Sequence, residues 1–116
     1  MKGFQELVVW QRAMELCEEI YRVAAKLPEQ ERFGLVQQVR RAAVSVPSNI
    51  AEGHSRQSTG DYRHHLQMAR GSAAEIQTQL ILAQRMAMIP PGTATKAMNL
   101  ADECMKMLAT LISKLR

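Results

Sequence analysis

A helical spacing of apolar residues, repeated in four segments, constrains the fold of this chain more than any other feature. The segments cover about residues 5–26, 30–53, 59–88 and 93–115. The third is the most regular, with steps of four and three residues through Tyr62, Leu66, Ala69, Ala73, Ile76, Leu80, Ala83 and Ala87. No segment alternates with a period of two, which is typical of a half-buried strand. We therefore predict an all-α protein, a single antiparallel up-down four-helix bundle domain over residues 1–116.

Proline, glycine and capping residues divide these segments. Pro28 is predicted to end the first helix, and the run Ile89-Pro90-Pro91-Gly92 marks a break before the fourth. Ser58, with Asp61 three residues later, has the spacing of a capping box, and Thr93 suits the N-cap of the last helix. Pro47 lies inside the second segment and removes a backbone donor, so a kink or a break is expected there. Gly53 is a plausible C-terminal stop.

The first and fourth segments are apolar over a wider face than a bundle core needs. In the first segment, one row comprises Leu7, Trp10, Met14, Cys17, Tyr21 and Ala24, and a second comprises Val9, Ala13, Leu16, Ile20, Val23 and Leu27. Extra apolar surface on a small protein usually marks an interface, so we expect a homo-oligomer. The alternative is a monomer with unusually deep burial.

The positive charge is concentrated in one stretch of the chain. Residues 32–70 hold six arginines and two acids, so this stretch accounts for the whole net charge of +4, and the remainder is neutral. Arginine suits bidentate contacts to phosphate. We therefore predict contacts to the backbone of RNA or DNA at Arg40, Arg41, Arg56, Arg63 and Arg70. The alternatives are a solvated face or arginines that pair with glutamates across a subunit interface. No base-reading motif accompanies them.

The sequence offers little for catalysis or cofactor binding. His64 and His65 are adjacent and point about 100° apart on a helix, so they do not chelate one metal together. No phosphate loop or nucleophile elbow occurs, so we expect a non-enzymatic protein without a metal or cofactor. Cys17 and Cys104 are expected to be reduced, buried thiols. No stretch approaches about 18 apolar residues, which predicts a cytoplasmic protein without a membrane segment.

Three stretches resemble one family closely. They are Phe33–Gly53 in the second helix, Phe4–Gln11 at the start, and Gly71–Leu80 in the third helix. These stretches are similar to the four-helix bundle proteins encoded in intervening sequences of bacterial 23S ribosomal RNA genes. The accessory variability determinant of diversity-generating retroelements looks like a relative. The match extends over nearly the whole chain.

The resemblance implies a cytoplasmic homopentamer that forms a ring with a central channel. It also implies RNA or DNA as a partner, or a reverse transcriptase, as in the retroelement relatives. An alternative function is therefore a protein scaffold without direct nucleic-acid contact. Within the motif, the family suggests structural roles for Pro47, Asn49 and Glu52. Asn49 could bond backbone freed by Pro47, and Glu52 could pair with Arg40 or Arg41.

Overall fold

The computed structural model describes residues 3–115, which form four long helices and no strand. Helix α1 spans Val8–Ala24, α2 spans Leu35–Ser55, α3 spans Thr59–Arg85 and α4 spans Thr95–Lys114. Short 3-10 turns, Phe4–Glu6 and Glu29–Glu31, precede α1 and α2. The helices pack in the neighbouring pairs α1–α2, α2–α3, α3–α4 and α1–α4. The predicted all-α class with four helices is confirmed.

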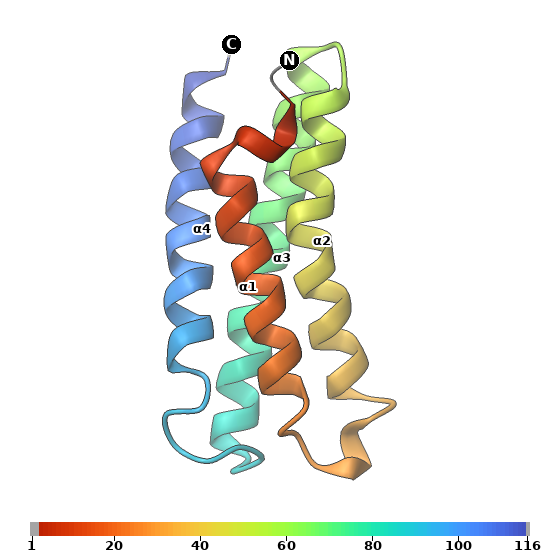
Figure 1. The fold of residues 1–116 in the computed structure, drawn as a ribbon, viewed down its shortest axis with the longest axis vertical. Coiled ribbons are helices and arrows are strands. Elements are labelled where there is room, and N and C mark those ends of the chain that lie inside the picture. Colours follow the sequence, from red (N-terminus) through yellow and green to blue (C-terminus); the bar gives the residue numbers. More distant parts are fainter. Residues whose placement is uncertain (1–2, 116) are drawn as a thin grey trace.

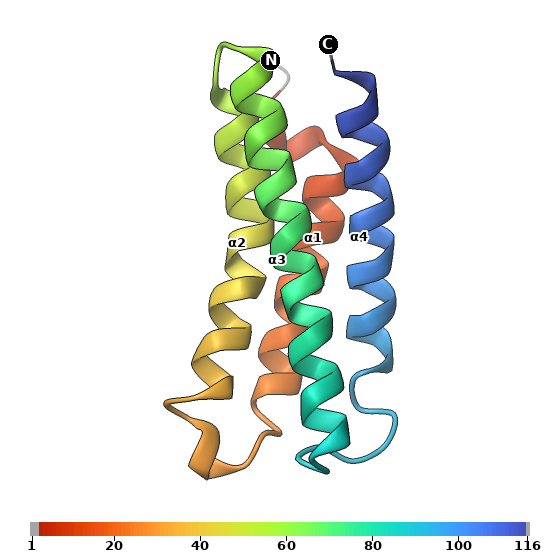
Figure 2. The ribbon, with the colours of Figure 1, turned by 180° about the vertical axis from the view of Figure 1, so that it is seen from behind.

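The molecule is an elongated bundle that measures 43 × 23 × 22 Å. In Figures 1 and 2, α1 begins and α4 ends at the same end of the molecule as the connection between α2 and α3. The α1–α2 and α3–α4 connections lie at the opposite end. Each connection is short, so helices that follow one another in sequence lie side by side.

The apolar rows supply the core, but the two rows of α1 are buried to different extents. Val9, Ala13, Leu16, Ile20 and Val23 are buried in the core, together with the α3 row from Leu66 to Ala83. In the other row, Trp10 and Cys17 are only half-buried, and Met14 and Tyr21 are exposed. That row lies beside α2 and leaves an apolar surface open to solvent.

Several helix boundaries differ from the predicted ones, each for a local backbone reason. Helix α1 begins at Val8 rather than residue 5 because Leu7 is extended, with ψ of 127°. Helix α2 begins at Leu35 rather than residue 30, after the irregular backbone of Gly34. It also continues to Ser55, so the prediction that Gly53 ends it is wrong.

The later boundaries depend on caps. The Ser58 side chain accepts a hydrogen bond from the Asp61 backbone N–H at 3.0 Å, which confirms the predicted N-cap of α3. Helix α3 ends at Arg85 rather than residue 88 because Ala87 adopts a left-handed conformation, with φ of 55°. The predicted cap at Thr93 is wrong, since α4 begins at Thr95 after Ala94, without a side-chain cap.

Helix α2 continues through Pro47 without a break, so that part of the prediction is wrong. The Asn49 amide donates to the Ser45 backbone oxygen and to the Ser45 hydroxyl, both at 2.9 Å. Pro47 leaves the carbonyl of Ala43 without its helical donor, and this carbonyl was the expected partner of Asn49. Asn49 does not contact it. Asn49 instead reinforces the turn that contains the proline.

Candidate nucleic-acid interface

The two arginines in the first half of α2 have different environments. Arg40 is half-buried, and its guanidinium carbon lies 5.0 Å from the centre of the Tyr21 ring on α1. The Arg40 Nε atom is buried and has no hydrogen-bond partner. Arg41 is exposed and makes no ion pair with any residue in the range 3–115. Arg40 therefore packs against α1, whereas the charge of Arg41 faces solvent.

Arg56 follows the last turn of α2, where it belongs to a small charged cluster. Its guanidinium donates to the Glu52 carboxylate at 2.7 Å, one helical turn away. The same carboxylate lies 3.6 Å from Nε2 of His65 on α3. The hydrogen bond from Arg56, followed by the nearby His65, lowers the pKa of Glu52 below its usual value. The predicted pairing of Glu52 with Arg40 or Arg41 is therefore wrong.

Arg63 and Arg70 lie on α3, seven residues apart. This spacing places them on one face of the helix, separated by about 10 Å along its axis. Arg63 is half-buried, Arg70 is exposed, and neither forms an ion pair within the described part of the chain. Arg70 also lines a shallow pocket with Met105 of α4, so this face is turned toward α4.

The five arginines therefore do not form a single patch on one chain. Arg40 faces α1, whereas Arg70 lies beside α4, on a different side of the bundle. Arg56 and Arg63 lie close to the α2–α3 connection, and the charge of Arg56 is offset by Glu52. Of these five, Arg41, Arg63 and Arg70 make no ion pair within residues 3–115.

Two interactions at these arginines were not predicted from the sequence. The stack of Arg40 on Tyr21 joins residues of different helices, and no local pattern indicates it. The pair of Glu52 and Arg56 has the i, i+4 spacing that favours an ion pair on a helix, so a signal for it was present.

Aromatic rings and histidines also gather near the α2–α3 connection. His54 and Tyr62 make an edge-to-face contact with ring centroids 5.7 Å apart. Nδ1 of His65 lies 3.0 Å from the backbone oxygen of Asp61. Across residues 3–115, no three His, Cys, Asp or Glu side chains are grouped so that they could hold a metal ion. The chemistry available at this end is charge and hydrogen bonding.

Neither thiol forms a disulfide. Cys104 is buried, and this burial raises its pKa to about 12. Cys17 is only half-buried, which departs from the prediction, although burial raises its pKa as well. Both groups are therefore protonated and weakly nucleophilic at neutral pH.

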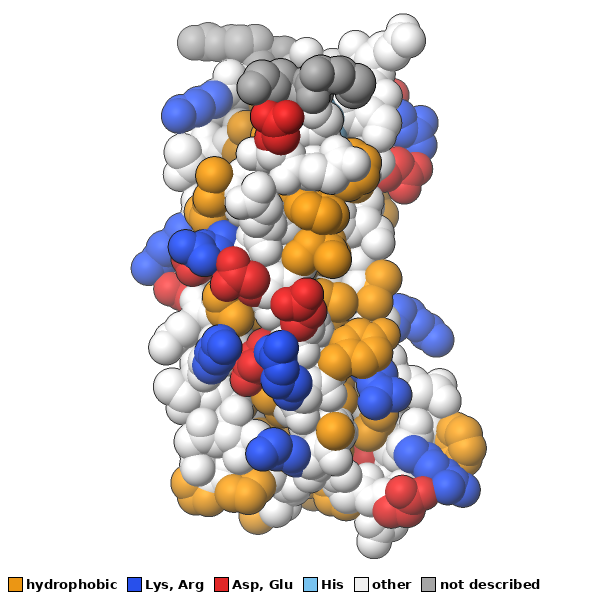
Figure 3. Space-filling model, in the orientation of Figure 1, with side chains coloured by type: hydrophobic (Ala, Val, Ile, Leu, Met, Phe, Trp, Pro, Cys, Tyr) orange, Lys and Arg blue, Asp and Glu red, His pale blue; other side chains and the backbone are white. Residues whose placement is uncertain are grey.

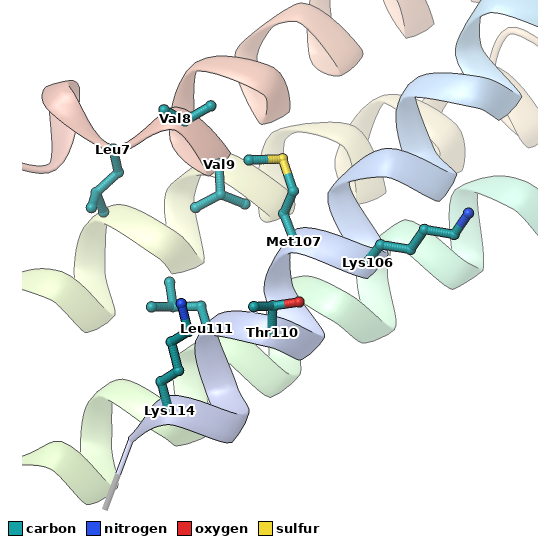
Figure 4. A pocket seen from close by; sticks show the side chains of 8 residues that line it. All are labelled: Leu7, Val8, Val9, Lys106, Met107, Thr110, Leu111 and Lys114. Atoms are coloured by element: carbon teal, nitrogen blue, oxygen red, sulfur yellow. The ribbon is translucent and has the colours of Figure 1, made fainter.

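A separate apolar pocket of about 400 Å³ opens between α1 and α4. Figure 4 shows Val9, Met107 and Leu111 converging on it, with Lys106 and Lys114 extending along its margin. Val8, at the start of α1, is 58% exposed beside it. This pocket lies outside the arginine-rich stretch and carries no catalytic group.

These features define a class: an all-helical protein of four packed helices with exposed arginines and no recognisable catalytic site among its described residues. The chain belongs to the family of 23S rRNA-intervening sequence proteins, whose family model matches residues 5–110. The expected family membership is thus confirmed. No curated protein matches the chain.

A solved structure agrees with this assignment. It is the crystal structure of a protein of unknown function from the S23 ribosomal protein family of Bacteroides thetaiotaomicron. The two proteins are 26% identical, the match covers 92% of this chain and 96% of that one, and the TM-score is 0.85. Neither description names a catalytic activity. In the range 3–115, no helix is long and apolar enough to cross a membrane.

Proposed function

We propose that this protein is a non-enzymatic nucleic-acid-binding module that acts as a ring of identical subunits in the cytoplasm. In this proposal the subunit is an up-down antiparallel four-helix bundle, the ring is a homopentamer, and its ligand is the phosphate backbone of RNA or DNA. The contacts are made by Arg41, Arg63 and Arg70, with Arg40 and Arg56 nearby.

One observation carries the proposal: three arginines of the stretch 32–70 make no ion pair within residues 3–115. Lys26, Arg85 and Lys114 also lack an ion pair there, but they lie outside that stretch. Elsewhere, Arg12 pairs with Glu15 and Glu103, Arg22 with Glu19, and Lys106 with Asp102. Arg41, Arg63 and Arg70 make no such pair within residues 3–115. An unpaired arginine can bind phosphate directly, because no acidic side chain must first be displaced from it. A ring of five would multiply this charge fivefold.

The test is the affinity for a structured RNA as a function of salt concentration. Counterion release should make the affinity fall steeply as salt rises. Replacing Arg41, Arg63 and Arg70 by alanine should weaken the binding and reduce the slope of its salt dependence by about 3, one for each phosphate contact. A matched control replaces Lys26, Arg85 and Lys96, which removes the same charge near the α1–α2 and α3–α4 connections at the other end. Equal loss of affinity in both variants would contradict the assignment to these arginines.

The alternative, a scaffold that binds a protein such as a reverse transcriptase, is favoured by the apolar pocket between α1 and α4. An exposed valine beside a groove of valine, leucine and methionine is typical of a surface that a partner covers. A complex with such a partner should then survive nuclease treatment and be lost in Val8→Glu. Loss of the complex upon nuclease treatment alone would favour direct nucleic-acid binding.

A further inference from the structure

An apolar groove lies between α1 and α2. It is a cavity of about 310 Å³ lined chiefly by Trp10, Met14, Cys17, Val44 and Pro47. Met14 is 36% exposed and Val44 42% exposed, and Tyr21 extends the groove along α1. In Figure 3, apolar side chains gather along this face of the molecule. Burial of such side chains against a partner is favourable.

A second apolar surface lies on the outer side of α3. Met68 and Leu82 are exposed there, and Ile81 and Met86 continue the surface toward the end of the helix. Met68 and Leu82 are fourteen residues apart, a multiple of seven, so they lie on one face of the helix. Three residues after Met68, Gly71 has no neighbour within 4 Å of where a Cβ would be, so a facing helix could approach closely.

The charges of these two surfaces are complementary. Arg41 lies about one helical turn before Val44 on α2, and it is exposed without an ionic partner among the described residues. Glu75 lies halfway between Met68 and Leu82 and is exposed. Among residues 3–115, its carboxylate accepts a side-chain hydrogen bond only from the neutral Gln79 amide, at 3.2 Å. When two apolar surfaces meet, opposite charges of this kind fix the register and exclude partners of the wrong sign.

We propose that the α1–α2 groove of one copy receives the outer face of α3 from a second copy of this chain. Leu82 enters the groove beside Met14 and Val44, and Glu75 approaches Arg41. Met68, about 21 Å from Leu82 along α3, packs on the extension of the groove toward Tyr21. The contact is heterologous, since each copy donates one surface and receives the other, and a contact of this type closes into a ring when its rotation permits. The inference rests on the self-assembly proposed above and names the surfaces that produce it.

The experiment uses two variants, each of which places a carboxylate on one surface, with the mass measured by light scattering. Met14→Glu and Leu82→Glu alter exposed side chains, so each should fold, as circular dichroism can verify. The wild type should be larger than one chain, and each variant alone should be a monomer of 13.0 kDa. Mixing the variants should give a dimer of about 26 kDa, because one intact groove can still meet one intact α3 face. Val8→Glu, a control at an exposed apolar residue outside both surfaces, should assemble like the wild type.

Other outcomes overturn the inference in distinguishable ways. If Leu82→Glu still assembles while Met14→Glu is a monomer, then the groove of one copy meets the groove of another, and α3 plays no part. Variants that both remain assembled, or a mixture that stays monomeric, would show that other surfaces carry the contact while self-assembly itself stands. A monomeric wild type would overturn the proposed self-assembly together with this inference.

Discussion

The contacts that α2 makes with α3 and with α1 differ in the size of the residues between the helices. Toward α3, α2 presents Ala42, Ser45 and Gly53, and the Ser45 hydroxyl lies 2.8 Å from that of Ser72. Toward α1, it presents Arg40 and Val44, opposite the large side chains of α1. The α2–α3 contact is therefore close and filled within one chain, whereas the α1–α2 contact leaves apolar side chains exposed.

This difference suggests a division of roles between the two contacts. Small residues permit close backbone approach, so the α2–α3 contact is satisfied by the fold itself and tolerates little added volume. Large residues spread the helix surfaces and leave a groove. The first contact is thus expected to govern folding stability, and the second to govern association.

The largest effect is expected for Gly53→Ala. The new Cβ would lie 2.7 Å from Cβ of His65 and 3.3 Å from the backbone oxygen of Tyr62, so α2 and α3 must separate. Overpacking should outweigh the better helix propensity of alanine and lower the free energy of unfolding by about 1–2 kcal/mol. Urea denaturation at a fixed protein concentration measures it. Gly60→Ala is the control, because nothing lies within 4 Å of its new methyl group. Equal stability of both variants would show that the α2–α3 contact is not tight.

A smaller effect is expected from the serine pair in the same contact. Ser72→Ala removes the hydrogen bond to Ser45 and should cost about 1 kcal/mol. After Ser45→Ala, the Ser72→Ala substitution should cost less, because its partner is already absent. A double-mutant cycle measures this coupling by urea denaturation. Strictly additive effects would mean that the two hydroxyls do not interact.

At the α1–α2 contact, Arg40→Gln should have a still smaller effect on folding. The substitution removes the cation–π contact with Tyr21 and should lower stability by about 0.5–1 kcal/mol. Arg41→Gln, one residue away and exposed, serves as the control and should leave stability unchanged within experimental error. If Arg41→Gln lowers the stability as much as Arg40→Gln does, the distinction between a packed arginine and a solvated one does not hold.

The smallest effect is a pH dependence at the charged end of the α2–α3 contact. The pKa of Glu52 is lower in the folded protein than its usual value, so its ionised form stabilises the fold above that usual value. The stabilisation is lost as pH falls through the lowered pKa. The melting temperature of Glu52→Gln should therefore lie slightly below that of the wild type at pH 7, and the gap should close in strong acid. A gap that widens on acidification would contradict this sign.

The helices could be predicted because each apolar row repeats over several turns, and the core residues Leu66 and Ile76 follow the row that predicted them. The boundaries depend on the conformations of single residues. Leu7 is extended, and Ala87 adopts a left-handed conformation, which is unusual for a residue other than glycine. Neither conformation has a periodic signal in the sequence.

The candidate site was less predictable, since contacts between helices decide which arginines are free. The sequence places Arg40 and Arg41 side by side, yet only Arg40 meets an aromatic ring, which belongs to another helix. Arg12 likewise pairs with Glu103, from the other end of the chain. Local spacing located the arginine-rich stretch but could not distinguish a packed guanidinium from an exposed one.

The placement of the beginning of α1 and the end of α4 at one end of the molecule has a practical consequence for protein engineering (Figure 1). A short linker could join them, and new termini could be opened in residues 86–94, between α3 and α4. Such a circular permutant would move any fused tag to the opposite end, away from Arg56 and Arg63. Ligands that approach the α2–α3 connection would then meet the short linker but no fused tag.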